Sequence, residues 1–172
     1  MTEASSPREP AEVPQSSWLH GVVAGLIGAG VISLVYFAID VAGGRPLYTP
    51  NALGAALLRG ESLGPEAPIE LTLVLGYTAV HGAVFIAFGL MAALAMLEGA
   101  RHLRSTVASA AVAAAALFAG FEITFEIFGL LFAPAGGRLG GWHAAFANAL
   151  AALAMAGYVT LIRARSTASP RA

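Results

Sequence analysis

The sequence predicts an all-α fold: a four-transmembrane-helix bundle with a short outer interfacial helix and a disordered N-terminal tail. Of the 172 residues, 58% are hydrophobic and 11% are charged, whereas about a quarter of the residues in a soluble domain are charged. Four apolar stretches reach the ~20 residues that cross a hydrocarbon core as a helix. Their continuous apolar runs lack the alternation of a membrane β-barrel, so helices must satisfy the backbone.

The chain divides into a leading tail, one membrane domain and a short C-terminal tail. Residues 1–17 are rich in Pro, Ser and Glu, which is typical of a disordered cytoplasmic tail and not of a cleaved signal. The membrane domain covers 18–163, and residues 164–172 form the second cytoplasmic tail. Within the domain, the predicted spans are 18–42, 70–97, 105–133 and 140–162.

The connection between the first two spans, residues 43–69, is the longest loop. Within it, Thr49 is a predicted N-cap with Pro50 at the first helical position, and Gly60 is a predicted stop. We therefore expect a short helix at the bilayer interface or over the end of the bundle. A connecting helix that caps the bundle and a gate for a ligand both fit this position.

The arginines predict the orientation, because basic residues concentrate on the cytoplasmic side of a membrane protein. The side that holds both tails and the loop at 98–104 carries Arg8, Arg101, Arg104, Arg163, Arg165 and Arg171. The other side carries only Arg45, Arg59 and Arg138. Both termini are therefore expected in the cytoplasm, with the protein in a bacterial inner (plasma) membrane.

Small residues recur at every fourth position of the first span. They are Gly21, Gly25, Ala29 and Ser33. A ridge of this kind lets two helix backbones approach closely in a membrane. We expect this face to contact another helix of the same bundle, although the same ridge would also suit self-association.

Polar side chains within the spans form the candidate site, because such groups are costly in lipid and usually face the bundle interior. Counting 1.5 Å per residue from the outer helix ends places His81, Glu122, Glu126 and Asn148 between roughly 10 and 16 Å deep. Tyr77 shares a helix face with His81, as Glu122 does with Glu126, because each pair is four residues apart.

Asp40 extends this polar layer to the outer end of the first span, on the stripe of Tyr36. Three interpretations are open for the layer. It is a hydrogen-bonded structural network, a route for protons or ions through an oligomer, or a metal site. The metal site would use His81, Glu122 and Glu126, whose donors suit Zn, Mn or Fe, but the chain lacks the Glu-x-x-His pairs of di-iron bundles.

Several cofactors and activities are excluded or disfavoured. The absence of cysteine excludes thiolate-bound metal and thiol redox chemistry. His81 and His143 differ in estimated depth, which disfavours a bis-histidine haem. No phosphate-binding loop, H-E-x-x-H or G-x-S-x-G motif occurs, so we expect a role other than catalysis. A formal net charge of −1 gives no reason to expect nucleic acid as a partner.

The expected outer half of the bundle also carries a characteristic set of residues. It comprises Asp40-x4-Arg45-Pro46-Leu47-x-Thr49-Pro50-x2-Leu53-Gly54, then Tyr77-Thr78-x2-His81 and Asn148. This combination resembles an uncharacterised family of four-helix bacterial integral membrane proteins, over residues 18–163. The resemblance implies the membrane bundle but supplies no reaction, cofactor or substrate.

The function expected from these residues is that of a small polytopic inner-membrane protein, acting as a subunit or as a binding protein through the polar layer. The alternatives are a membrane metalloprotein or redox accessory that uses His81, Glu122 and Glu126, and a proton- or ion-coupled small transporter that acts as an oligomer. The expected partners are the lipid bilayer and either further copies of the chain or another membrane protein.

Overall fold

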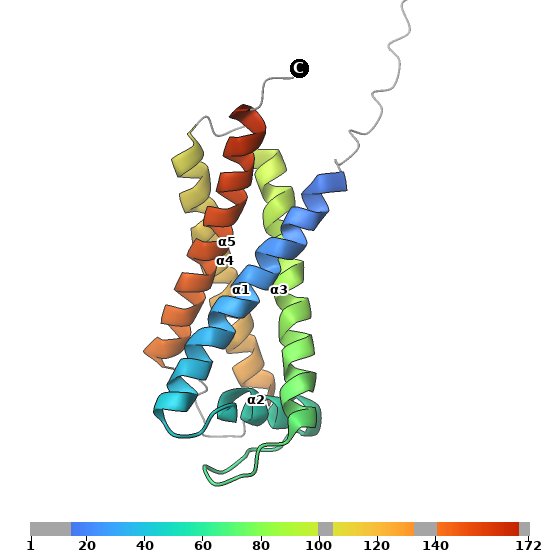
Figure 1. Ribbon diagram of the computed structural model, residues 1–172, viewed down its shortest axis with the longest axis vertical. Coiled ribbons are helices and arrows are strands. Elements are labelled where there is room, and N and C mark those ends of the chain that lie inside the picture. The colour runs from blue at the N-terminus through green and yellow to red at the C-terminus, as the bar shows by residue number, and fades with distance from the viewer. Residues whose placement is uncertain (1–14, 100–104, 133–140, 169–172) are drawn as a thin grey trace, which may run out of the picture.

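The computed structural model describes residues 15–99, 105–132 and 141–168, and every element within these ranges is a helix. The helices are α1 (Gln15–Ala42), α2 (Tyr48–Arg59), α3 (Leu71–Gly99), α4 (Thr106–Phe132) and α5 (Trp142–Ala168). The four long helices run along the bundle, and the short α2 lies across one end (Figure 1). The predicted all-α fold is confirmed. We call the end that carries α2 the capped end, and the other the opposite end.

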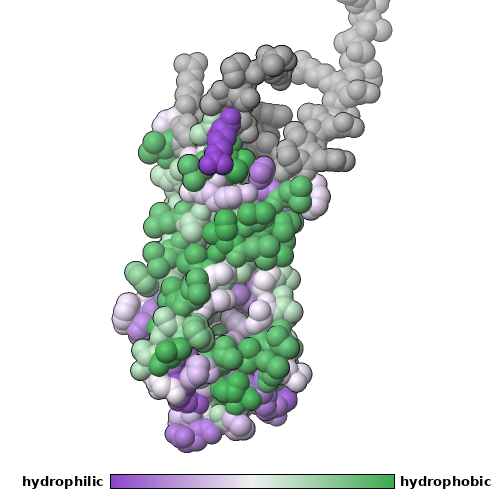
Figure 2. Space-filling view, in the orientation of Figure 1, coloured by the Kyte–Doolittle hydropathy of each residue, from purple (hydrophilic) through white to green (hydrophobic). Residues whose placement is uncertain are grey.

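The surface of the bundle is that of a membrane protein. In the described residues, four helical segments are long and apolar enough to cross a membrane: Trp18–Ala42, Leu71–Ala95, Val107–Phe132 and Trp142–Arg165. Large apolar side chains such as Leu34 and Leu130 point outward, and apolar side chains dominate the middle of the surface (Figure 2). So much exposed apolar surface is unfavourable in water. The chain is therefore a multi-pass membrane protein.

Three helices extend past the predicted spans, α3 by only two residues. α1 begins at Gln15, within the predicted tail, whose first 14 residues lie outside the described part of the chain. α5 continues to Ala168, past the predicted boundary at 163. A helix can leave the membrane without interruption because its backbone hydrogen bonds are internal. Hydropathy marks where a helix leaves lipid, and it does not mark where the helix ends.

α1 is the central helix of the bundle. It packs against α3 on one side and α5 on the other, while α4 packs mainly against α5. The core between them combines a few large side chains, among them Phe85, Phe121 and Met155, with buried alanines. Because the alanines are small, the helix backbones lie close together, as is common in membrane bundles.

α1 crosses α3 in close backbone contact at glycines. A Cβ atom added to Gly25 would lie only 2.5 Å from Cα of Ile86 and would also overlap the Phe85 carbonyl oxygen. A Cβ atom on Gly89, from the side of α3, would lie 2.5 Å from the backbone nitrogen of Gly25. Only glycine allows this separation, so the crossing is specified by the sequence.

The predicted ridge on α1 takes part in this crossing only over its first three positions. Gly21 faces the backbone of Leu90, and Ala29 is buried on the same side, but Ser33 is exposed. Past the crossing, α1 is tilted away from α3, so the two helices diverge toward the capped end (Figure 1). Ser33 lies on this diverging part of α1, and the wedge between the two helices contains the candidate site.

Candidate functional site

The first turn of α2 is capped by a side chain from another helix. α2 begins at Tyr48, after Leu47 in a left-handed conformation (φ 69°) that supplies no side-chain cap. Asp40 of α1 instead accepts hydrogen bonds from the backbone nitrogen (2.8 Å) and the hydroxyl (2.6 Å) of Thr49. A carboxylate is well suited to this position because it satisfies an N–H at the positive end of the helix. The prediction that Thr49 is the N-cap is therefore wrong.

The end of α2 is as predicted. Gly60 adopts φ 67°, its N–H donates to the Ala56 carbonyl at 3.1 Å, and the next N–H, of Glu61, donates to the Ala55 carbonyl at 3.2 Å. Glycine is favoured here because it adopts the left-handed conformation without steric cost. The predicted stop at Gly60 is confirmed.

Asn51 holds α2 against the start of α3. Its side chain has no exposed surface, and its amide nitrogen donates to the Pro68 carbonyl at 3.0 Å. Its amide oxygen accepts the N–H of Glu70 at 2.8 Å. One turn further, Gly54 lies directly against the backbone of Leu73. Asn51 was not predicted as a buried residue, because an Asn in a short loop helix gives no sign of burial in the sequence.

Charged residues add an exposed set of contacts around α2. Arg59 donates two hydrogen bonds to Glu70, at 2.6 and 3.1 Å, and these bonds lower the pKa of the Glu70 carboxyl below its ordinary value of 4.5. Because both side chains are exposed to solvent, the ion pair contributes little to stability. The guanidinium of Arg45 lies 3.7 Å from the ring centre of Tyr48.

A cavity of about 460 Å³ lies beneath α2, in the wedge between α1 and α3. This volume is within the range of small-molecule sites. Its walls come from all five helices and are mainly aromatic and aliphatic. The phenylalanines that line it are Phe85, Phe88, Phe121, Phe125 and Phe128. The space-filling surface is hollowed in this region, and paler, more polar atoms are visible within the apolar surround (Figure 2).

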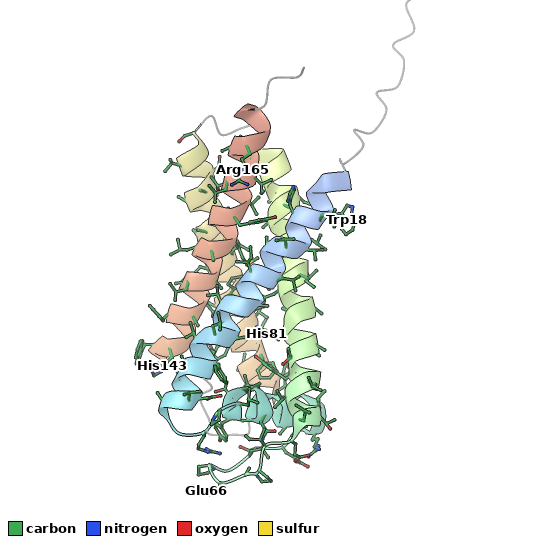
Figure 3. All side chains as sticks on the ribbon, in the orientation of Figure 1. Trp18, Glu66, His81, His143 and Arg165 are labelled. Atoms are coloured by element: carbon green, nitrogen blue, oxygen red, sulfur yellow. The ribbon has the colours of Figure 1, made fainter. Side chains whose placement is uncertain are left out.

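Three polar side chains that line the cavity each have a polar atom without a hydrogen-bond partner in the described residues. His81 lies inside the bundle between α1 and α3 (Figure 3), with its ring 5.5 Å from that of Tyr77 and 4.7 Å from that of Phe85. The ring hydrogen-bonds to the backbone of Ala29, whereas its Nε2 atom is buried and has no hydrogen-bond partner within the described ranges. The hydroxyls of Tyr36 and Tyr77 also lack protein hydrogen bonds in that part of the chain. An unpaired polar atom in such a site is costly, so these groups are suited to a ligand.

Glu122 and Asn148 form the second part of the polar layer. The amide nitrogen of Asn148, which also lines the cavity, donates to Glu122 at 2.8 Å and so joins α5 to α4. The Glu122 carboxyl also interacts electrostatically with Tyr36. The structure thus brings together Tyr36, Tyr77, His81, Glu122 and Asn148 from four helices.

Glu126 does not join this layer. It is exposed on the surface of α4, although Glu122 one turn earlier faces the bundle. Two positions four residues apart on an α-helix point in directions that differ by about 40°. This difference is enough to turn the Glu126 carboxyl away from α5. Among the described residues, no three His, Asp or Glu side chains converge as metal ligands would. The site expected from His81, Glu122 and Glu126 is therefore not assembled.

Two further histidines, His143 and His20, lie toward the two ends of the bundle. His143 is in the first turn of α5, at the capped end (Figure 3), where its ring lies 3.9 Å from that of Trp142. His20 lies toward the opposite end, and its Nδ1 is 3.0 Å from the hydroxyl of Tyr158. His143 borders the cavity, and His20 does not take part in it.

No protein-family model, curated protein or solved structure matches this chain. The resemblance to a four-helix bacterial membrane family stays a prediction. Several of the residues that carry it have a structural use at α2, namely Asp40, Arg45, Leu47, Thr49 and Gly54. The cavity and its unpaired polar groups are therefore the features that point to a function.

Proposed function

We propose that the protein is a small inner-membrane binding protein that holds a membrane-soluble small molecule in the cavity beneath α2. The observation that carries this proposal is the unpaired Nε2 of His81 in the wall of a largely apolar cavity of about 460 Å³. Ligand sites are typically concave and mostly apolar, with a few polar groups that orient the ligand. A binding role also agrees with the absence of a recognisable catalytic motif.

The position of the cavity supports a ligand that arrives from the bilayer. α1 and α3 diverge at this level (Figure 1), and the exposed side chains of Ile39 and Val80 line both the cavity and the outer surface. α2 closes the capped end above it. A molecule dissolved in the hydrocarbon region would therefore enter between α1 and α3 more directly than one dissolved in water.

The alternative functions have less support. A metalloprotein or redox accessory would need Glu126 beside Glu122 and His81, and Glu126 faces outward. A proton or ion route would have to continue from the cavity to the opposite end. The described interior there is packed with apolar residues, among them the fully buried Met155 and Ala152. An ion would lose its hydration among such side chains without replacement ligands.

A large side chain introduced into the cavity should prevent the ligand from binding. Ala52 lines the cavity from α2, so Ala52→Trp is expected to displace the ligand by occupying its volume. Native mass spectrometry of the protein released from membranes should detect a bound molecule on wild type and not on Ala52→Trp. Ala115→Trp, on the exposed face of α4, is the matched control and should retain it. The proposal would be contradicted if the wild-type protein carried only phospholipid and both variants carried the same amount of it.

We further propose that both ends of the chain are cytoplasmic, so that the cavity lies in the periplasmic half of a bacterial inner membrane. Six arginines belong to the side that holds both tails and three to the other side, which supports this orientation. The start of α1 and the end of α5 also lie at the same end of the bundle (Figure 1). A periplasmic phosphatase reporter is expected to be active when fused after Glu61 and inactive after Arg171. The reverse pattern would overturn the orientation.

A further inference from the structure

We infer that the ligand of this cavity is an uncharged molecule with a planar ring and a ring carbonyl, as in a quinone. This inference rests on the proposed binding function and names the chemical class. The cavity combines unpaired hydrogen-bond donors at one side with aromatic rings around the rest. A ring carbonyl matches both features in one rigid group.

The charge of the lining favours an uncharged ligand. No arginine lines the cavity in the described residues, and the chain has no lysine. A carboxylate or phosphate would therefore lose its hydration without gaining a cationic partner, which is strongly unfavourable. The acidic residue in the lining, Glu61, is exposed, and Glu122 is already hydrogen-bonded to Asn148.

Several polar groups of the lining already form hydrogen bonds within the protein. The hydroxyl of Tyr48 donates to the Leu63 carbonyl, that of Thr49 donates to Asp40, and that of Thr124 donates to the Gly120 carbonyl. Glu61 and Ser62 are exposed, and His143 lies at the capped end. Inside the bundle, the groups that remain are the phenols of Tyr36 and Tyr77 and Nε2 of His81.

The two phenols are hydrogen-bond donors, one on α1 and one on α3. His81 differs from them, because its ring already hydrogen-bonds to the Ala29 backbone, and its unpaired Nε2 is then an acceptor in the neutral ring. Each phenol would donate its O–H to an acceptor placed between the helices. A carbonyl oxygen has two lone pairs and no proton, so it can accept from both phenols at once.

The aromatic walls favour a planar ring. The rings of Phe85 and Phe121 lie 4.7 Å apart, and Phe88 meets Phe121 edge to face at 4.9 Å. His81 continues this cluster through Phe85 at 4.7 Å. A flat ring adds favourable aromatic contacts to such a cluster, beyond the area that it buries. An alkyl tail on the ring would leave toward the bilayer between α1 and α3.

The test compares two ligands that differ in their oxygen atoms. Wild-type protein in lipid nanodiscs is incubated with a tritium-labelled benzoquinone that carries a ten-carbon chain, with protein-free nanodiscs as the background for partitioning. Unlabelled quinone and unlabelled decylbenzene then compete for the site. The quinone should compete about ten-fold better, because two net hydrogen bonds are expected to contribute about 1.4 kcal/mol.

Single substitutions test the donors. Tyr36→Phe and Tyr77→Phe should each weaken quinone binding about three- to ten-fold and leave decylbenzene competition unchanged. Tyr158→Phe removes a phenol of the same type that bonds His20 outside the cavity, and it should leave both ligands unaffected. Melting midpoints identify any variant that loses its fold, and the two-ligand comparison on wild type does not depend on variants.

The outcomes separate this inference from the proposed function. Saturable binding with equal competition by both ligands would overturn the carbonyl class and leave the binding function standing. Failure of both to bind above the nanodisc background would contradict the proposed function itself. A quinone preference that survives Tyr36→Phe and Tyr77→Phe unchanged would overturn the assignment of the donors.

Discussion

Gly25→Leu is expected to prevent stable folding of the bundle. A Cβ atom at this position lies 2.5 Å from the Ile86 Cα atom, and leucine adds three further carbons. The obstacle is backbone and not a flexible side chain, so α1 and α3 must separate along their whole contact. Overpacking a core costs about 1–3 kcal/mol and sometimes more, and we expect this substitution to cost at least about 3 kcal/mol.

The measurement is unfolding of the purified protein by titration with sodium dodecyl sulfate, followed by far-ultraviolet circular dichroism and intrinsic fluorescence. Gly30→Leu is the matched control, because it lies on the same helix and a Cβ atom there meets nothing within 4 Å. Its effect should stay within about 0.5 kcal/mol. Equal destabilisation by both variants would show that the close crossing is not the cause.

Asn51→Leu is expected to release α2 from the bundle. Leucine is similar in size, but it leaves the Pro68 carbonyl and the Glu70 N–H without their partners. Each unsatisfied buried group costs about 1–3 kcal/mol, so the expected loss is about 2–6 kcal/mol. The loss falls mainly on the attachment of α2, because both bonds join it to the segment before α3.

Proteolysis after glutamate, within the segment that follows α2, measures this release. Glu61 and Glu66 provide cleavage sites there, and both should be cut faster in Asn51→Leu than in wild type in the same detergent. Arg59→Gln is the control, because it removes only the exposed ion pair with Glu70 and should change stability by less than about 1 kcal/mol. Cleavage that is faster in Arg59→Gln than in Asn51→Leu would contradict the role assigned to Asn51.

The features predicted correctly are those with local signals in the sequence. Long apolar stretches predicted the four spans, and the glycine after Arg59 predicted the end of α2. The start of α2 was misplaced because its cap, Asp40, lies on a different helix, and spacing within the loop cannot reveal it. Glu126 was misplaced because periodicity shows which residues share a face and does not show which face meets a neighbour.

The cavity itself was not predicted. Phe85, Phe121 and Phe125 look in the sequence like any apolar residues of a span, whether they face lipid or an interior space. Only the tilt of α1 against α3 determines which of them line a cavity, and this tilt depends on contacts between distant parts of the chain. Tyr77, His81 and Asn148 were predicted as site residues from their cost in lipid, whereas their grouping with Tyr36 required the fold.

The close contact of α1 with α3 at Gly25 is a point about which α1 can pivot. Asp40 is 15 residues beyond Gly25, or roughly 22 Å along α1, so a rotation of about 5° at the crossing moves that end of the helix by roughly 2 Å. Because the Asp40 carboxylate holds the first turn of α2, this displacement is transmitted to the helix that covers the cavity. Any widening between α1 and α3 at the capped end is therefore mechanically linked to a shift of α2.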